Sequence, residues 1–253
     1  MNKGKTRREV FLGNMFDLLP KVFAEKRTTF QSKSTFHYVV GIPDSDEIEP
    51  RPSLVEYIKL LNQFSETIFN ASDKNSIFFF LQTDKYSREP PMWIDKMLYI
   101  SQVAMKHGFY PFCKKIIIND FEQNDSSRST YTNLYGFMRI DKNVYSKNKQ
   151  FMKDELLYNG NKTWINGFAV NAVDLCVNFI KRNSKVRDYY IVDPFIGQGS
   201  LLAVCDLYGI KSIGIDIEED KVKVAKELEI SRDQLNQIIR DAKMKLERCY
   251  INK

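Results

Sequence analysis

Short runs rich in apolar residues recur along the chain and predict the strands of a buried sheet. Runs without strict alternation of polar and apolar residues are typical of strands that are covered on both faces. The runs are also rich in β-branched and aromatic residues, which strands favour. The predicted strands are residues 36–40, 76–81, 114–118, 131–139, 189–192 and 212–215.

Apolar residues at helical spacing predict helices between these strands. Ser53 is a plausible N-cap for a helix whose apolar residues include positions 54, 58, 61, 64 and 68. Pro90 and Pro91 are expected to open a second helix, which Gly108 ends. Further helices are predicted over residues 170–180, 218–228 and 231–253.

Strands that alternate with helices over this length indicate an α/β fold with a doubly wound, mostly parallel sheet. Residues 36–253 are interpreted as a single domain, and the capping box of Ser231 and Gln234 begins its C-terminal helix. The polar segments 119–130 and 145–161 are expected to be loops.

Residues 1–35 are interpreted as a basic N-terminal extension that forms a separate layer. Basic residues such as Lys21, Lys26 and Lys33 alternate with Phe23 and Phe30 there. Such a segment can bind phosphates and stack on bases. The alternative is a solvated arm that packs a few aromatic rings onto the body of the protein.

The composition is that of a globular protein with a substantial core, because 43% of the 253 residues are hydrophobic and 28% are charged. A net charge of +6 suits a polyanionic partner such as nucleic acid. The four cysteines are scattered and are expected to be reduced thiols, without a metal site. With no long apolar run and no apolar signal core, we expect no membrane partner and an intracellular protein, either cytoplasmic or nuclear.

The stretch from Asp193 to Ser200 has the layout of a nucleotide-cofactor site: a strand, a turn with two glycines, and a helix that starts with the apolar run 201–204. Glycines allow a positive φ and a close approach of the backbone to a ligand. Asp216 ends the next strand, 23 positions after Asp193, near the offset of about 20 residues at which an acid meets ribose hydroxyls. Leu202 stands where a dinucleotide fingerprint has its third small residue. A ligand with a ribose but without a pyrophosphate is therefore favoured.

The segment Asp193-Pro194-Phe195-x-Gly197-x-Gly199-Ser200 resembles the DPFxGxGS/T motif of S-adenosylmethionine-dependent amino-methyltransferases. The motif stands late in the chain, as in the circularly permuted β-class enzymes of DNA and RNA. This resemblance implies a Rossmann-like methyltransferase fold with residues 36–140 as the catalytic half, residues 160–230 as the cofactor-binding half and S-adenosylmethionine as the cofactor. The residues that it assigns to the cofactor are Asp193, Pro194, Phe195, Gly197, Gly199, Ser200, Asp216, Ile217 and Thr163.

The catalytic motif of these enzymes, a strand end of the form (D/N/S)PP(Y/F/W), is only partly matched by Gly41-Ile42-Pro43-Asp44. The polar first residue and the aromatic last residue are both missing. Pro43 and Asp44 are the catalytic candidates, with Asp44 as acceptor of the amine hydrogens or as general base. Asp84, at the end of the strand at 76–81, is a second acceptor. The alternatives are an acidic loop at Asp44 and an exposed strand end at Asp84.

Three aromatic residues are candidates to replace the missing ring that would stack on a flipped base. They are Tyr38, Tyr86 and Trp93, although a tryptophan at a helix start can also be a core residue. The chain is also similar to bacterial methyltransferase sequences that have an LPD-type turn, a Q-T/S-D strand end and a W-I/V-D-K helix start. The chain has Ile42-Pro43-Asp44, Gln82-Thr83-Asp84 and Trp93-Ile94-Asp95-Lys96 at these places.

The resemblance implies methyl transfer to an amine of a nucleic-acid base. RNA is favoured over DNA, because no long insertion resembles a base-recognition domain. Two alternatives stay open: a methyltransferase of a protein or small molecule, and a cofactor-binding assembly factor without catalysis, which Gly41 motivates. A protein partner or a homodimer is also compatible with the sequence.

Overall fold

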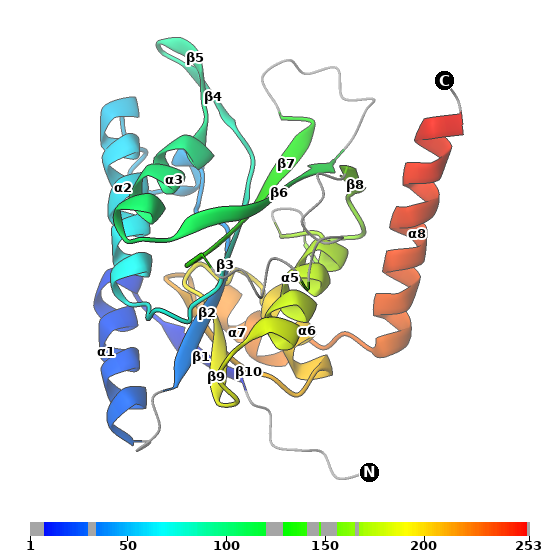
Figure 1. Ribbon diagram of the computed structural model, residues 1–253. Helices are drawn as coiled ribbons and strands as arrows, with labels where there is room; N and C mark the ends of the chain where they lie inside the picture. Colours follow the sequence, from blue (N-terminus) through cyan, green and yellow to red (C-terminus); the bar gives the residue numbers. More distant parts are fainter. Residues whose placement is uncertain are drawn as a thin grey trace.

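The computed structural model describes residues 8–29, 34–119, 129–140, 147, 156–164 and 167–251. Its centre is an eight-stranded sheet in which β7 alone runs antiparallel to the strands beside it. This arrangement confirms the predicted α/β fold with a mostly parallel sheet (Figure 1). In their order across the sheet the strands are β1 (Arg8–Leu12), β10 (Lys211–Asp216), β9 (Tyr189–Asp193), β2 (Thr35–Val40), β3 (Phe78–Gln82), β7 (Tyr131–Met138), β6 (Tyr110–Ile118) and β8 (Leu156–Tyr158).

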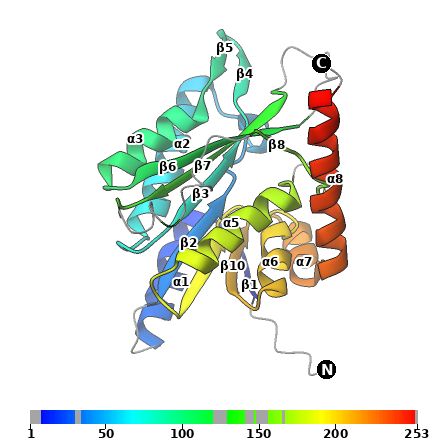
Figure 2. The ribbon, with the colours of Figure 1, turned by 45° about the vertical axis from the view of Figure 1, so that its right-hand side comes forward.

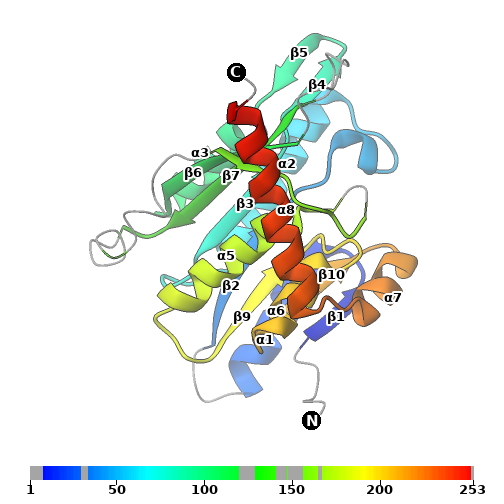
Figure 3. The same ribbon diagram turned by 90° about the vertical axis from the view of Figure 1, so that its right-hand side faces the viewer.

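Helices cover both faces of the sheet (Figure 2). One face carries α1 (Met15–Thr29), α2 (Leu54–Asn70) and α3 (Lys96–Lys106). The other carries α5 (Val170–Asn183), α6 (Ser200–Leu207) and α7 (Glu219–Glu227). The C-terminal helix α8 (Arg232–Ile251) lies outside α5 and beside β8 (Figure 3).

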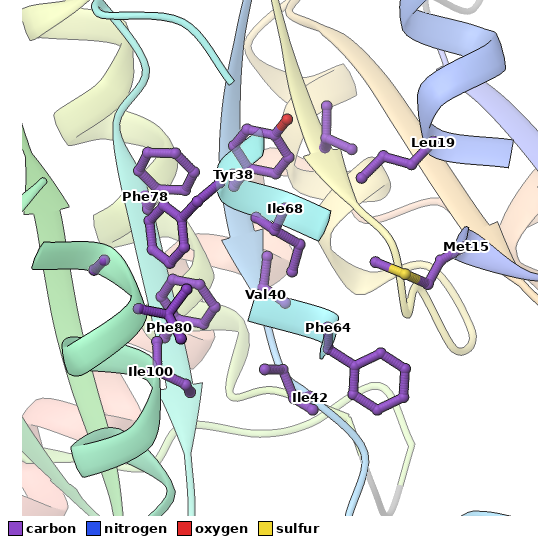
Figure 4. Close-up of a cluster of buried hydrophobic side chains, with 14 of the residues drawn as sticks. Met15, Leu19, Tyr38, Val40, Ile42, Phe64, Ile68, Phe78, Phe80 and Ile100 are labelled. Carbon is purple, nitrogen blue, oxygen red and sulfur yellow. The ribbon is translucent and has the colours of Figure 1, made fainter. Parts of the chain in front are cut away.

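Successive residues of the central strands point to opposite faces, which divides the core into two clusters. Tyr38 and Val40 face the α1–α3 side, whereas Val39 between them packs against the α5–α6 side. On the α1–α3 side, the rings of Phe78 and Phe80 in β3 form a layer with residues of α2 (Figure 4). Because both faces of β2 and β3 are buried, their near-continuous apolar sequence is explained.

Several predicted helix ends are confirmed by their capping contacts. The Ser53 hydroxyl accepts a hydrogen bond from the backbone of Glu56, and the Glu56 carboxylate accepts one from the Ser53 amide. At the start of α8, Ser231 and Gln234 make the reciprocal pair of bonds. These local patterns need only neighbouring residues, which explains why the sequence reveals them.

The prediction that a helix opens at Pro90 and Pro91 is wrong. This segment forms a two-stranded hairpin of β4 (Lys85–Arg88) and β5 (Pro91–Ile94), which projects at the top of Figure 1. The helix α3 begins only at Lys96, where the Asp95 carboxylate caps it by accepting from Leu98 N at 3.1 Å. A proline at the first residue of an edge strand loses no ladder hydrogen bond, so the hairpin tolerates it.

The interpretation of residues 1–35 as a separate layer is also wrong for the part that the structure describes. β1 is an edge strand of the main sheet and pairs in parallel with β10. Arg8 donates from Nε to Asp206 at 2.7 Å and from Nη1 to the Ala225 carbonyl at 2.9 Å. The partners of β1 lie about 200 positions away in the chain, so no local pattern could reveal the pairing. Residues 1–7 and 30–33 lie outside the described residues.

Two further expectations concern segments that are only partly described. The predicted loop at 119–130 has residues 120–128 outside the described residues. In the predicted connection at 145–161, residues 156–158 form β8, and most of the other residues of this connection lie outside the described residues. Cys113, Cys176 and Cys205 are buried free thiols, as expected. In the described part of the chain, every helix is too short or too polar to cross a bilayer.

Candidate active site

A cavity of about 510 Å³ opens at the carboxyl ends of β10, β9, β2 and β3. Its walls combine the turn after β9, the segment after β2 and the residues that follow β1. The α1–α3 side of the core reaches it too, since Ile42 and Phe64 belong both to the core and to the cavity wall (Figure 4). In a parallel sheet, this edge is where ligands bind.

Asp193, at the end of β9, is a buried acid on the cavity wall. Its carboxylate accepts a hydrogen bond from Phe195 N at 3.0 Å. Burial raises the pKa of Asp193 to about 8, and the nearby charge of Asp216 raises this pKa as well. A carboxyl of this kind would become ionised when a cationic group binds beside it.

Asp216, at the end of β10, is tied to the glycine-rich turn. It accepts from Gly197 N at 2.9 Å on one oxygen and from Glu218 N at 2.9 Å on the other. The two predicted cofactor acids therefore come together through the turn between them, as the motif implies. Each carboxylate oxygen still has acceptor capacity for a ligand hydroxyl.

The turn from Pro194 to Ser200 is shaped by close packing. Gly199 precedes α6 with a φ of 91°, a conformation that favours glycine, and a Cβ there would lie 2.7 Å from the Ala225 backbone. Gly199 itself does not line the cavity, whereas Pro194, Phe195, Gly197 and Ser200 do.

Thr163 does not line the cavity either. Its hydroxyl is hydrogen-bonded to the Ser200 hydroxyl, so it contacts the turn. The neighbouring Trp164 does line the cavity and packs against Gly197, where a Cβ would lie 2.5 Å from the indole. Ile217 also lines it and is 69% exposed, which leaves an apolar side chain open beside Asp216.

Asp44 also lines the cavity and forms an ion pair with a buried lysine. Lys96 Nζ lies 2.5 Å from Asp44 Oδ1, and the Lys96 side chain is only 2% exposed. Lys85 Nζ is 3.8 Å from the other Asp44 oxygen and 2.7 Å from Asp46. A buried cation needs such a counter-charge, so this pair holds Asp44 as a hydrogen-bond acceptor.

Gly41 explains part of the departure from the catalytic motif. A Cβ at Gly41 would collide with the ring of Phe168, which lines the cavity at this point. The space that a polar side chain of the motif would need is therefore filled by an aromatic ring. Pro43, two residues on, lines the cavity, and its carbonyl accepts from Tyr57 Oη at 3.0 Å.

Asp84 lies outside the cavity lining. It accepts hydrogen bonds from Tyr131 Oη at 3.0 Å and from Asn133 Nδ2 at 3.3 Å. Burial raises the pKa of this half-buried carboxyl, and the hydrogen bond from Tyr131 lowers it. The contacts place Asp84 in a polar cluster between strand ends.

The three aromatic candidates do not line the cavity. Tyr38 is fully buried and stacks on Phe78 with ring centroids 4.9 Å apart, so its predicted contact with the substrate is wrong. Tyr86 and Trp93 lie opposite each other in the hairpin with ring centroids 5.4 Å apart. The Trp93 side chain is 45% exposed, so it remains open to a partner outside the cavity.

Several cavity residues are not predicted by the sequence. Asn14 and Phe16 follow β1, and Lys96 begins α3. Lys96 does belong to the run Trp93-Ile94-Asp95-Lys96, which is similar to a helix start in other methyltransferase sequences. Only the fold shows that this lysine is buried against Asp44.

Together, the doubly wound sheet, the glycine-rich turn between two acids and the cavity at the strand ends define a Rossmann-like cofactor-binding protein. A family model described as DNA methylase, covering the N6 and N4 enzymes, matches residues 22–227. The chain therefore belongs to this family of S-adenosylmethionine-dependent amino-methyltransferases, and its cofactor is S-adenosylmethionine. No match was found among curated proteins.

Solved structures with the same fold have low sequence identity to the chain. PvuII DNA methyltransferase, which is cytosine-N4-specific, is 14% identical and superposes with a TM-score of 0.62, over 92% of this chain and 91% of that one. TTHA0409 of Thermus thermophilus, assigned as a DNA modification methylase, is 14% identical with a TM-score of 0.60, over 92% and 96% of the two chains. The M1.HpyAVI–SAM complex is 14% identical with a TM-score of 0.55, over 87% and 98%.

Proposed function

We propose that this protein methylates an exocyclic amine of a base in DNA. The observation that carries the proposal is that one cavity joins the Asp193–Asp216 turn to Asp44. Methyl transfer is an in-line displacement, so donor and acceptor must meet in a shared space. DNA replaces RNA as the favoured substrate, because the matching family model describes DNA methylases.

The cofactor side of the cavity suits the parts of S-adenosylmethionine. Asp193 would face the ammonium of the methionine arm, Asp216 the ribose hydroxyls and Ile217 the adenine ring. Phe195 is part of this wall, and its ring meets that of Phe64 edge-on at 5.0 Å. The cofactor supplies an electrophilic methyl group on a sulfonium.

On the substrate side, Asp44 takes the role of the missing motif residue. Its carboxylate accepts an N–H of the target amine, which keeps the nitrogen lone pair directed at the methyl carbon. Methylation would replace one hydrogen of the amine by the methyl group from the sulfonium, and Asp44 or solvent would take up the released proton. Lys96 balances the charge of Asp44 before the base enters.

Pro43 contributes through its backbone. Its carbonyl can accept a second amine hydrogen in addition to the bond from Tyr57 Oη, because a carbonyl oxygen has two lone pairs. Asp84 acts at a distance, by ordering Tyr131 and Asn133 at the neighbouring strand end. Tyr86 and Trp93 contact DNA outside the cavity.

A second candidate function is cofactor binding without catalysis, and one observation favours it. Phe168 fills the place of a catalytic side chain at Gly41. In that case, the protein would bind S-adenosylmethionine as tightly as an enzyme and transfer no methyl group.

Transfer of labelled methyl groups into separate DNA, RNA and protein fractions distinguishes these functions. The proposal expects label in DNA, and none with an Asp193→Ala variant. Label only in RNA or protein would contradict the choice of DNA. Tight cofactor binding by calorimetry without label in any fraction would instead support the non-catalytic function.

A further inference from the structure

Gln82 has a side-chain amide nitrogen for which the described residues offer no hydrogen-bond partner. The residue is the last of β3, is 2% exposed and lines the cavity. Its Nε2 atom is buried and has no hydrogen-bond partner among the described residues. Buried donors in proteins are almost always paired, so such an atom calls for an explanation.

The position of Gln82 in the sheet points to the substrate. β9, β2 and β3 are adjacent and parallel, so their carboxyl ends lie side by side at one edge. Asp193 ends β9, Asp44 follows β2, and Gln82 ends β3. Gln82 therefore lies beyond Asp44 as seen from the cofactor turn, on the side that the proposed function assigns to the substrate.

The chemistry of the two side chains is complementary to one edge of a base. Asp44 accepts hydrogen bonds, and the Gln82 amide nitrogen donates them. In adenine and cytosine, the exocyclic amine stands beside a ring nitrogen that accepts. In guanine, the amine lies between N1, which carries a hydrogen and donates, and N3, which accepts.

We propose that Gln82 recognises the target base by donating a hydrogen bond from Nε2 to the ring nitrogen beside the methylated amine. This inference rests on the proposed function and adds a specificity-determining residue to it. The terminal torsion of a glutamine side chain is broad, so a small rotation turns the covered amide toward the cavity. The pair of Asp44 and Gln82 matches the Watson–Crick edge of adenine or cytosine, whereas on that edge of guanine the N1 hydrogen would meet the Gln82 donor.

Another buried residue provides a matched control. Ser212 in β10 is fully buried, and its hydroxyl oxygen also has no hydrogen-bond partner in the described part of the chain. Ser212 does not line the cavity. Ser212→Ala should therefore leave methyl transfer unchanged, whereas Gln82→Leu should reduce kcat/KM by about 10- to 100-fold, as expected for one lost substrate hydrogen bond.

The decisive experiment pairs this variant with an altered base. The target base is first identified in unmethylated genomic DNA treated with the wild-type protein. A duplex of that sequence is then synthesised with the ring nitrogen of the target replaced by C–H, as 1-deazaadenine or 3-deazacytosine. The wild type should lose about 10- to 100-fold in kcat/KM on the altered duplex, and Gln82→Leu should show no further loss.

A loss of equal size in the wild type and in Gln82→Leu would overturn the role of Gln82, while the proposed function would stand. Calorimetry with S-adenosylmethionine and thermal unfolding show whether Gln82→Leu binds the cofactor and folds as the wild type does. If only Gln82→Leu fails to fold, Gln82→Met takes its place in the same comparison. Wild-type protein that labels no DNA would contradict the proposed function and this inference with it.

Discussion

At the scale of single residues, the pKa of Asp193 connects cofactor binding to pH. Burial raises this pKa to about 8, so below pH 8 the carboxyl of the free protein carries a proton. A cationic methionine arm favours the carboxylate, and binding then releases the proton. We expect the affinity for S-adenosylmethionine to rise about tenfold for each pH unit between about pH 5.5 and 7.5.

Calorimetry in buffers of different ionisation enthalpy measures both the affinity and the released proton. The neutral variant Asp193→Asn should bind weakly at every pH and lose the slope. A wild-type affinity that does not change with pH would contradict the proposed contact between Asp193 and the ammonium.

The ion pair of Asp44 and Lys96 is asymmetric, because the Lys96 side chain is 2% exposed and that of Asp44 is 24% exposed. Asp44→Asn leaves a buried cation without its counter-charge and should reduce the free energy of unfolding by about 3–5 kcal/mol. Lys96→Met leaves an acid that water can reach, so it should reduce the free energy of unfolding by less than Asp44→Asn does. The double variant should recover much of the loss, and urea unfolding of all three measures the difference.

Gly41 and Phe168 form a close contact that can be tested by a double-mutant cycle. Gly41→Ala places a methyl group against the Phe168 ring and should reduce the free energy of unfolding by about 1–3 kcal/mol. In a Phe168→Ala background, the same substitution should cost almost nothing. An equal cost in both backgrounds would show that the ring is not what excludes a side chain at Gly41.

At the scale of elements, β1 depends on contacts with distant parts of the chain. Arg8 is bound to Asp206 and to the Ala225 carbonyl, beyond the ladder to β10. We expect Arg8→Ala to reduce the free energy of unfolding by about 1–3 kcal/mol, because it removes hydrogen bonds to a charged group. The exposed Arg88 of β4 is a matched control, and Arg88→Ala should change stability by less than about 0.5 kcal/mol.

Hydrogen exchange locates the effect of Arg8→Ala. The amides of β1 should exchange faster than in the wild type, and those of β3 at an unchanged rate. Unchanged protection of β1 would mean that the ladder to β10 alone fixes this strand.

The same elements show how far local sequence patterns predict structure. Ser53 and Ser231 indicate helices because a cap and its partner lie within three residues. The hairpin at residues 85–94 is hard to distinguish from a helix start, because Pro90-Pro91 is as compatible with an edge strand as with a first turn. β1 escapes prediction because its pairing with β10 is set by the fold.

At the scale of the whole molecule, the residues proposed for the cofactor could be found in the sequence more readily than those proposed for the substrate. Asp193, Gly197 and Asp216 occur in one motif and the strand after it, and each acid accepts a hydrogen bond from a backbone amide of the turn, Asp193 from Phe195 and Asp216 from Gly197. The substrate wall instead combines Asp44, Gln82 and Lys96 from three elements. The order of the strands in the sheet brings these three side chains together, and no spacing in the sequence reveals that order.

This cavity is proposed to transfer methyl groups to base amines of DNA. Nucleoside mass spectrometry of unmethylated DNA after incubation with the protein and S-adenosylmethionine tests it most directly. We expect N6-methyladenine or N4-methylcytosine with the wild type and neither with the Asp193→Ala variant. Cofactor binding without either methylated nucleoside would contradict the proposed function.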